Sequence, residues 1–196
     1  GAFQLSASSV RTILRQNDLG MDRTGRVRGS SKRRKPDRPE SLNGPNQCWA
    51  WDVSFIRTDV RRTYFFLFVM IDEWSRKVVA WRVTRHHDHE ESMALIDQAI
   101  LSENLLDADK EDQPVVVNDR GSQMKAKEVR QMFTELGLTQ TFSRPKTPND
   151  NPFIESFFST LKCSHSYPGW FEHDNEDQVR GYLQDYFRWY NTEHLH

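Results

Sequence analysis

Three carboxylates of this chain, Asp52, Asp119 and Glu155, occupy positions from which side chains of separate elements can converge. Asp52 falls in the alternating segment 48–56, on the polar face opposite the tryptophans. Asp119 directly follows the short apolar run 115–117, at the end of a strand where open α/β sheets bind their ligands. Glu155 falls in the first turn of a predicted helix. These residues therefore form a candidate catalytic and metal-binding set.

One carboxylate from each of several elements gives an open site for Mg²⁺ or Mn²⁺, which prefer hard oxygen ligands. Two such ions about 3.5–4 Å apart neutralise the attacking and leaving oxygens when a phosphodiester is displaced in line. Glu155, Ser159 and Lys162 share one helix face, so the lysine can follow a phosphate backbone. The residue types indicate metal-dependent phosphoryl transfer, with two ions present when DNA is bound.

The spacing of these residues is weak evidence without its context. Asp119 and Glu155 are separated by 35 residues, but with 28 acidic residues in the chain about one such Asp–Glu pair is expected by chance. Asp37 and Glu73 in fact form a second pair with the same separation. We interpret that pair as a coincidence, because Asp37 lies in a predicted linker.

The apolar pattern predicts the elements that must position the carboxylates. The order is β-β-β-α-β-α-β-α-α, which indicates an α/β fold with a mixed sheet whose first three strands form an antiparallel meander. The final predicted helix carries an apolar stripe that serves either core packing or a protein interface. The predicted strands are 48–56, 64–71, 76–83, 115–117 and 138–142, and the helices are 90–101, a segment ending at Gly137, one starting at Pro152, and 175–191.

The charge is divided unevenly along the chain. Residues 1–38 carry ten Lys and Arg against three acids, so this segment is +7 and the remainder is −8, for a net charge of −1. A basic arm on an acidic domain is typical of contact with DNA phosphates, and a solvated charged tail is the alternative. The candidate DNA contacts here are Arg33, Arg34 and Lys35. The pattern of residues 8–19 predicts a short helix, and the composition of residues 20–46 predicts a linker.

Several motifs occur together in one order along about three-quarters of the chain. They are WDVS at 51–54, DEWSR at 72–76, NDRGSQ at 118–123, SRPKTP at 143–148, DNPFIESFFSTLK at 150–162 and YN at 190–191. In these motifs the chain resembles the integrase core of insertion-sequence transposases related to retroviral integrases, the DDE enzymes of the ribonuclease-H-like superfamily. Asn118 departs from the serine more often found before this aspartate.

The resemblance implies a ribonuclease-H-like fold, a five-stranded mixed sheet flanked by helices with a basic N-terminal arm. Residues 1–45 would be the arm and linker, with 8–19 as a remnant of a helix-turn-helix, and 46–196 the catalytic core. The family's metal-binding triad falls on Asp52, Asp119 and Glu155.

The implied function is that of a DNA transposase, which cuts DNA at element ends and joins the freed strand to a target without a nucleotide cofactor. The implied partners are DNA and further copies of the chain. Two alternatives stay open. One is an inactive relic that binds DNA or protein, and the other is a nuclease of the same superfamily that cuts without joining.

Other residues have competing interpretations. Arg144 and Lys146, in a loop beside the predicted site, are candidate DNA contacts, and a solvated loop is the alternative. The segment HHDH at 86–89 has no partner pair with zinc-ligand spacing and predicts a polar loop with a helix cap. The tryptophans can stack on bases, but core packing is favoured for them. These are Trp49, Trp51, Trp74 and Trp81.

The composition also limits the class of protein. Two cysteines cannot build a disulfide framework. No apolar run reaches the roughly 18 residues of a membrane helix, and no signal-peptide pattern opens the chain. We therefore expect a cytoplasmic protein that is nucleoid-associated when it is bound to DNA.

Overall fold

The computed structural model describes residues 37–144 and 150–195, which lie in the second of two compact units, Lys35–His196. The first unit, Gly1–Arg34, falls entirely outside the described residues. The helix predicted at 8–19 and four candidate DNA contacts also lie outside the described residues. These four residues are Arg33, Arg34, Lys35 and Lys146.

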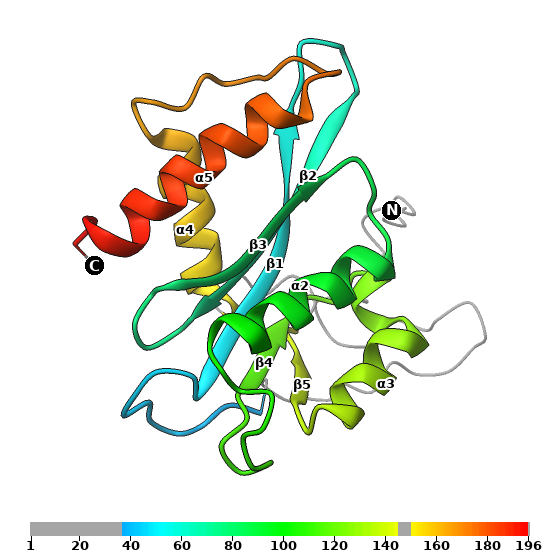
Figure 1. Ribbon diagram of the computed structural model, residues 1–196, viewed down its shortest axis with the longest axis vertical. Coiled ribbons are helices and arrows are strands. Elements are labelled where there is room, and N and C mark those ends of the chain that lie inside the picture. Colours follow the sequence, from blue (N-terminus) through cyan, green and yellow to red (C-terminus); the bar gives the residue numbers. More distant parts are fainter. Residues whose placement is uncertain (1–36, 145–149, 196) are drawn as a thin grey trace, which may run out of the picture. The chain divides into compact units, whose positions relative to one another are not determined.

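A five-stranded mixed sheet forms the centre of the fold, as predicted, with the order β3-β2-β1-β4-β5 (Figure 1). β1, β2 and β3 form the antiparallel meander, and β4 and β5 extend the sheet in parallel from β1. The two parallel connections each contain a helix, as parallel pairing requires. The strands are β1 (Cys48–Arg57), β2 (Tyr64–Asp72), β3 (Val78–Thr84), β4 (Val115–Asn118) and β5 (Thr139–Phe142).

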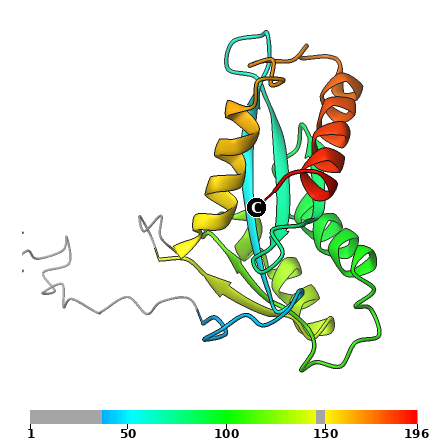
Figure 2. The ribbon, with the colours of Figure 1, turned by 90° about the vertical axis from the view of Figure 1, so that its left-hand side faces the viewer.

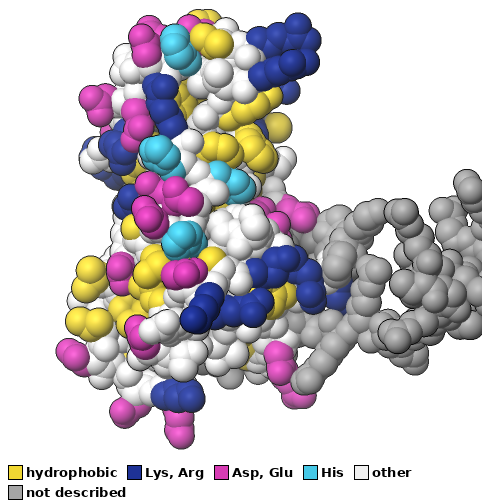
Figure 3. Space-filling view, turned by 90° about the vertical axis from the view of Figure 1, so that its right-hand side faces the viewer, with side chains coloured by type: hydrophobic (Ala, Val, Ile, Leu, Met, Phe, Trp, Pro, Cys, Tyr) yellow, Lys and Arg dark blue, Asp and Glu magenta, His cyan; other side chains and the backbone are white. Residues whose placement is uncertain are grey.

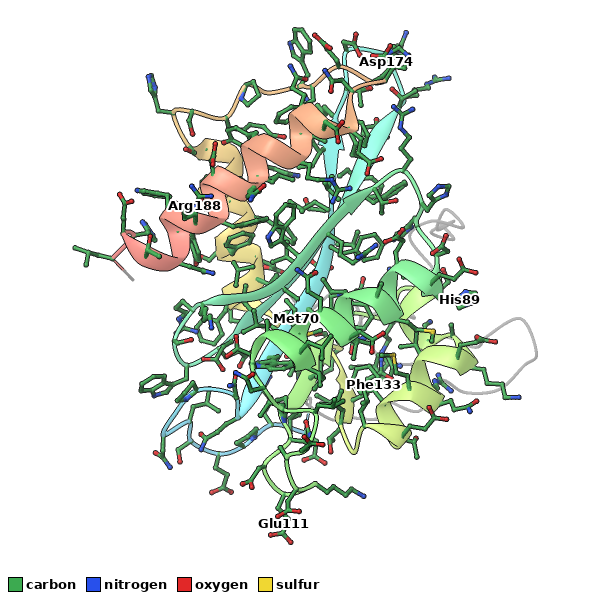
Figure 4. The ribbon with its side chains drawn as sticks, in the orientation of Figure 1. Met70, His89, Glu111, Phe133, Asp174 and Arg188 are labelled. Carbon is green, nitrogen blue, oxygen red and sulfur yellow. The ribbon has the colours of Figure 1, made fainter. Side chains whose placement is uncertain are left out.

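Two hydrophobic cores cover the sheet, one with α2 and α3 and the other with α4 and α5. Met70 of β2 and Phe133 of α3 both belong to the first core and point into it (Figure 4). The view in Figure 2 shows α4 running alongside β1. The helices are α2 (His89–Ser102), α3 (Lys127–Glu135), α4 (Pro152–Cys163) and α5 (Glu176–Thr192), with a short 3-10 helix, η1 (Gln123–Lys125), before α3.

The alternation of side chains along β1 decides which core each residue enters. Trp49 and Trp51 are buried against α2 and α3, whereas Ala50 and Ile56 are buried on the side of α4 and α5. β2 contributes buried apolar residues to both cores, which confirms it as a central strand covered on both faces. The apolar stripe of α5 is buried in the second core, so it serves packing.

Local signals placed several ends of elements correctly. The Asp88 carboxylate accepts a hydrogen bond from Glu91 N at 3.1 Å and caps α2. Gly137 has a φ of +71° just after α3, the left-handed conformation expected of a residue that ends a helix. Pro152 is the first residue of α4.

The turn between β2 and β3 is longer than predicted, and β3 begins at Val78 instead of residue 76. The buried Asp72 carboxylate holds this turn by accepting hydrogen bonds from Asn46 N, Ser75 N and Ser75 Oγ. Trp74 in the same turn is 50% exposed, so the packing favoured for it was wrong. The turn directs Asp72 inward and leaves Trp74 in solvent.

The end of α5 is fastened to the edge of the sheet by one amide side chain. Asn191 Oδ1 accepts a hydrogen bond from Val78 N at 2.8 Å, and Asn191 Nδ2 donates to Val78 O at 3.0 Å. The amide thus pairs with β3 as a neighbouring strand would, which fixes where α5 ends relative to the sheet. No helix in the described ranges, 37–144 and 150–195, has both the length and the apolar character to cross a membrane.

Candidate active site

Asp52 lies in the middle of β1 and faces α4. Its neighbours on the opposite face, Trp51 and Val53, contact the core below α2 and α3, so the alternation of the strand turns the carboxylate the other way. The side chain is half-buried, and Asp52 Oδ1 accepts a hydrogen bond from Val53 N at 2.8 Å. The carboxylate is therefore held beside its own strand and points toward the helix that carries Glu155.

Asp119 follows the last residue of β4 and stands next to Asp52. The parallel register pairs Trp51 with Asn118, so the next residue along each strand is an aspartate on the α4 side of the sheet. Neighbouring strands are about 4.8 Å apart. Asp119 Oδ1 accepts a hydrogen bond from Gly121 N at 2.7 Å, and Asn118 Nδ2 donates to the Asp119 carbonyl at 2.8 Å. The backbone bend after β4 is thereby fixed.

Glu155 lies in the first turn of α4, whose start is tied to β1. Asn151 Nδ2 donates to the Trp51 carbonyl at 3.5 Å, and Glu155 N donates to the Asn151 carbonyl at 3.4 Å. One residue thus connects the strand of Asp52 with the helix turn of Glu155. The Glu155 side chain is exposed, at the edge of the helix face that buries Ile154 and Phe158.

The electrostatics of Asp52 place the three carboxylates in one region. The pKa of Asp52 is raised from 3.8 to about 7, mainly by burial and in smaller part by the negative charges of Asp119 and Glu155, while the Val53 backbone hydrogen bond acts to lower it. Within 37–144 and 150–195, however, no three His, Cys, Asp or Glu side chains lie close enough together to hold a metal ion. The three carboxylates therefore interact electrostatically, but they do not by themselves form a complete set of metal ligands.

A network of ion pairs braces the loop that leads into α4. Asp150 is bound by Arg144 in bidentate fashion, with Nε at 2.9 Å and Nη2 at 2.7 Å from its two oxygens. This hydrogen-bonded partner holds the pKa of Asp150 below its usual range. DNA contact by Arg144 stays a prediction. In the structure, the Arg144 guanidinium contacts the Asp150 carboxylate.

Arg38, in the segment before β1, joins this network to the β2–β3 turn. Its Nη1 forms an ion pair with the buried Glu73 carboxylate at 3.0 Å, and its Nη2 donates to the Asp150 carbonyl. Arg76 of the turn lies over the Phe153 ring, 3.5 Å from its centroid. These contacts connect the start of α4 to the segment before β1 and to the β2–β3 turn.

Lys162, seven residues after Glu155, reaches β1 at Ser54. Lys162 Nζ donates to Ser54 Oγ at 2.7 Å, and burial lowers the pKa of the lysine, as does the nearby charge of Arg57. Ser54 lies on the same face of β1 as Asp52. The helix face predicted from the sequence, Glu155 to Lys162, therefore borders the strand face that carries Asp52.

The residues that position the site were not singled out from the sequence. Asn151 stands in a recognised motif, but only the fold shows that its amide contacts the strand of Asp52. Arg38 was counted as part of a basic linker, and its partners are 35 and 112 residues away. No local pattern signals contacts of that range.

Two models of the integrase core domain match the chain, one over residues 43–148 and one over 136–196. The transposase of insertion sequence element IS904 from Lactococcus lactis is 28% identical over 171 residues, which are 81% of this chain and 62% of that protein. The transposase InsF of insertion sequence IS3A from Escherichia coli is 30% identical over 151 residues, 75% of this chain and 50% of that protein. The chain thus spans about half to three-fifths of these relatives.

Solved structures share the fold at low sequence identity. A chain of the simian T-cell lymphotropic virus intasome aligns with a TM-score of 0.57 and 18% identity, covering 94% of this chain and 62% of the viral chain. The catalytic domain of Mos1 mariner transposase aligns with a TM-score of 0.54 and 13% identity, covering 73% of this chain and 70% of that domain. These likenesses support the predicted ribonuclease-H-like architecture.

Proposed function

This chain belongs to the integrase core domain family, and we propose that it is the catalytic part of a bacterial insertion-sequence transposase that cuts and joins DNA with divalent metal ions. The observation that carries the proposal is the β1–β4 register, which sets Asp119 beside Asp52, on the side of the sheet covered by α4, the helix that carries Glu155. The three carboxylates come from β1, the end of β4 and α4, and the two other charges act on the pKa of Asp52.

The donor set fits a divalent cation. All three side chains are carboxylates, the hard oxygen ligands that Mg²⁺ and Mn²⁺ take, and two of them, Asp119 and Glu155, are exposed. Burial does most to raise the pKa of Asp52 and the charges of Asp119 and Glu155 add to it, so a bound cation would favour the ionised carboxylate. The Mos1 transposase catalytic domain, which shares the fold, has been solved with Mn. Asp52, Asp119 and Glu155 are the proposed ligands.

Bound Mg²⁺ or Mn²⁺ would supply charge neutralisation at the attacking and leaving oxygens of a phosphodiester. The chain itself would fix the positions of the three carboxylates. β1 and β4 fix the two aspartates through the sheet register, and Asn151 fixes the turn of Glu155 against β1. At neutral pH the metal-free Asp52 carboxyl would be divided between its protonated and ionised forms, so ligand formation would release a proton from it.

Two phosphoryl transfers would follow one another at this site. Hydrolysis at an element end would free a 3′-hydroxyl, and that hydroxyl would then attack a phosphodiester of the target. One phosphodiester bond breaks as another forms in the second step, so neither a nucleotide cofactor nor a covalent protein intermediate is needed. We further infer that the enzyme works as a homo-oligomer on paired DNA ends in the bacterial cytoplasm, near the nucleoid.

A labelled branched DNA that mimics the joined product tests the activity without knowledge of the element ends. With Mn²⁺ present, we expect the chain to join strands on this DNA and Asp119→Asn to join none. The exposed position of Asp119 leaves the circular dichroism spectrum of the variant unchanged. Equal joining by the variant would refute the assignment. Cutting without joining would favour the non-joining nuclease, and DNA binding that is indifferent to metal would favour the inactive relic.

A further inference from the structure

A separate polar pocket lies at the far end of β1. β4 pairs only with Cys48–Trp51, so in the described part of the chain the second half of β1 has a neighbouring strand only on the β2 side. Phe171 N donates to the Arg57 carbonyl at 3.0 Å, which places the loop before α5 beside this open edge. The pocket has a volume of about 390 Å³. Its lining consists of Phe55, Arg57, Lys162, Tyr167, Pro168 and Gly169.

The pocket carries two positive charges without a matching negative charge. Burial lowers the pKa of Lys162 and the nearby charge of Arg57 lowers it further, whereas burial raises the pKa of Tyr167 and the Arg57 charge acts against that rise. Among residues 37–144 and 150–195, no carboxylate forms an ion pair with Arg57 or Lys162, whose ammonium donates to the neutral Ser54. Two like charges held together in this way favour an anion between them.

The surroundings of the pocket extend the positive charge and add an apolar wall. Arg61 and Arg62, both exposed, lie in the adjoining β1–β2 hairpin. At this end of the molecule Lys and Arg side chains gather beside exposed hydrophobic side chains (Figure 3). Phe55 is 51% exposed, and its ring packs edge-on against Tyr64 with a centroid distance of 5.7 Å. A ligand with both a charged and a flat apolar part matches these features, and a nucleotide of a DNA strand is such a ligand.

Arg57, five residues after Asp52, lies on the other face of β1, and Lys162, which lines the pocket and donates to Ser54 on the Asp52 face, links the two faces across the open edge of the strand. From Asp52 to Arg57 the strand advances about 17 Å at roughly 3.4 Å per residue, which equals the rise of about five nucleotides of duplex DNA. Resting on the proposed function, we propose that Arg57 and Tyr167, together with Lys162, bind a backbone phosphate of the DNA strand that passes the carboxylates. Phe55 lies against the sugar or base of that nucleotide. This pocket anchors DNA away from the reacting atoms.

The test compares Arg57→Gln with Arg188→Gln, both in the non-cutting Asp119→Asn chain. Arg188 is a control of equal charge change, because it lies on α5 with a side chain 68% exposed, away from the hairpin end that Asp174 marks (Figure 4). Binding of a short fluorescein-labelled duplex is measured by anisotropy between about 50 and 200 mM salt. We expect Arg57→Gln to weaken binding about three- to tenfold and to reduce the salt slope by about 1, with no change for Arg188→Gln.

Further variants separate charge from shape. Arg57→Lys keeps the charge and retains most of the affinity, whereas Tyr167→Phe loses only the hydroxyl contact and weakens binding less than Arg57→Gln. Equal affinity and salt slope for Arg57→Gln and the parent would overturn the proposal, even if the chain joins DNA strands. A loss confined to inorganic phosphate, measured by calorimetry, would also overturn it and show a small-anion site.

The two proposals fail in distinguishable ways. If the Arg57→Gln effect on DNA binding is present but the chain with Asp119 intact joins no strands, the pocket is a DNA site and the proposed activity is wrong. If neither the parent nor Arg188→Gln binds DNA, the pocket proposal falls together with the proposed function. Circular dichroism of each variant excludes unfolding as the cause.

Discussion

Replacing Asp52 with asparagine should make the metal-free protein more stable at neutral pH while it removes activity. The amide has the shape of the carboxyl group and can still accept the Val53 N–H. It cannot ionise, so it avoids the free energy of placing a negative charge in a half-buried position near Asp119 and Glu155. The substitution therefore tests the electrostatics of the site through the free energy of unfolding, without an activity assay.

The expected size follows from the shift of the Asp52 pKa from 3.8 to about 7. Because the folded protein binds the proton more tightly than the unfolded chain, the contribution of this group to stability is fully present below about pH 4 and is lost as the pH rises to about 7. One pKa unit corresponds to about 1.4 kcal/mol, so the loss is at most about 4 kcal/mol. Remaining contact of Asp52 with water lowers this figure, and we expect about 1–3 kcal/mol.

Urea unfolding in the presence of a chelator, from pH 4 to pH 8, measures this effect. The free energies of unfolding of the parent and Asp52→Asn should agree near pH 4, and the variant should be the more stable by about 1–3 kcal/mol at pH 8. Asp97→Asn, which removes an exposed carboxylate from α2, controls for the loss of one charge. A difference that does not change with pH would refute the reasoning.

Divalent cations should reverse the order of stability. Mn²⁺ binds the ionised carboxylates of the folded parent, and at 100 times its dissociation constant it adds about 2.7 kcal/mol to the free energy of unfolding. Asp52→Asn should gain much less. An equal gain in both proteins would show that Mn²⁺ binds elsewhere, and the assignment of Asp52 as a metal ligand would then be wrong.

Two further substitutions probe the supports of the site. Asn151→Ala removes the contact with the Trp51 carbonyl, so we expect about 10- to 100-fold weaker Mn²⁺ binding by calorimetry with little change in DNA affinity; unchanged Mn²⁺ affinity would contradict a positioning role. Asn191→Ala removes both hydrogen bonds to Val78 and should lower the free energy of urea unfolding by about 1–3 kcal/mol. Strand joining below the unfolding transition should persist, and its loss would place Asn191 closer to the chemistry than the fold indicates.

Part of this protein was readable from local sequence. The continuous apolar run of β2 predicts a strand buried on both faces, and it contributes to both cores. Asp88, Gly137 and Pro152 mark helix ends through their own side chains or backbone preferences, and all three stand where predicted. The motifs also indicated the family and the candidate carboxylates, because residue types and their order along the chain can be recognised without knowledge of the tertiary contacts.

The tertiary structure decided how the carboxylates relate to one another. The β1–β4 register places Asp119 beside Asp52, and Asn151 sets the turn of Glu155 against β1. The exposure of Phe55 also depends on the fold, because the sequence pattern placed it on the same face as the buried Trp49 and Trp51. Such features arise from contacts between residues about 100 positions apart, as with Asn151 and Trp51. The sequence determined each element because helix caps, turns and alternation act over a few residues. The site required the whole fold because its register and packing are fixed by long-range contacts that no local pattern encodes.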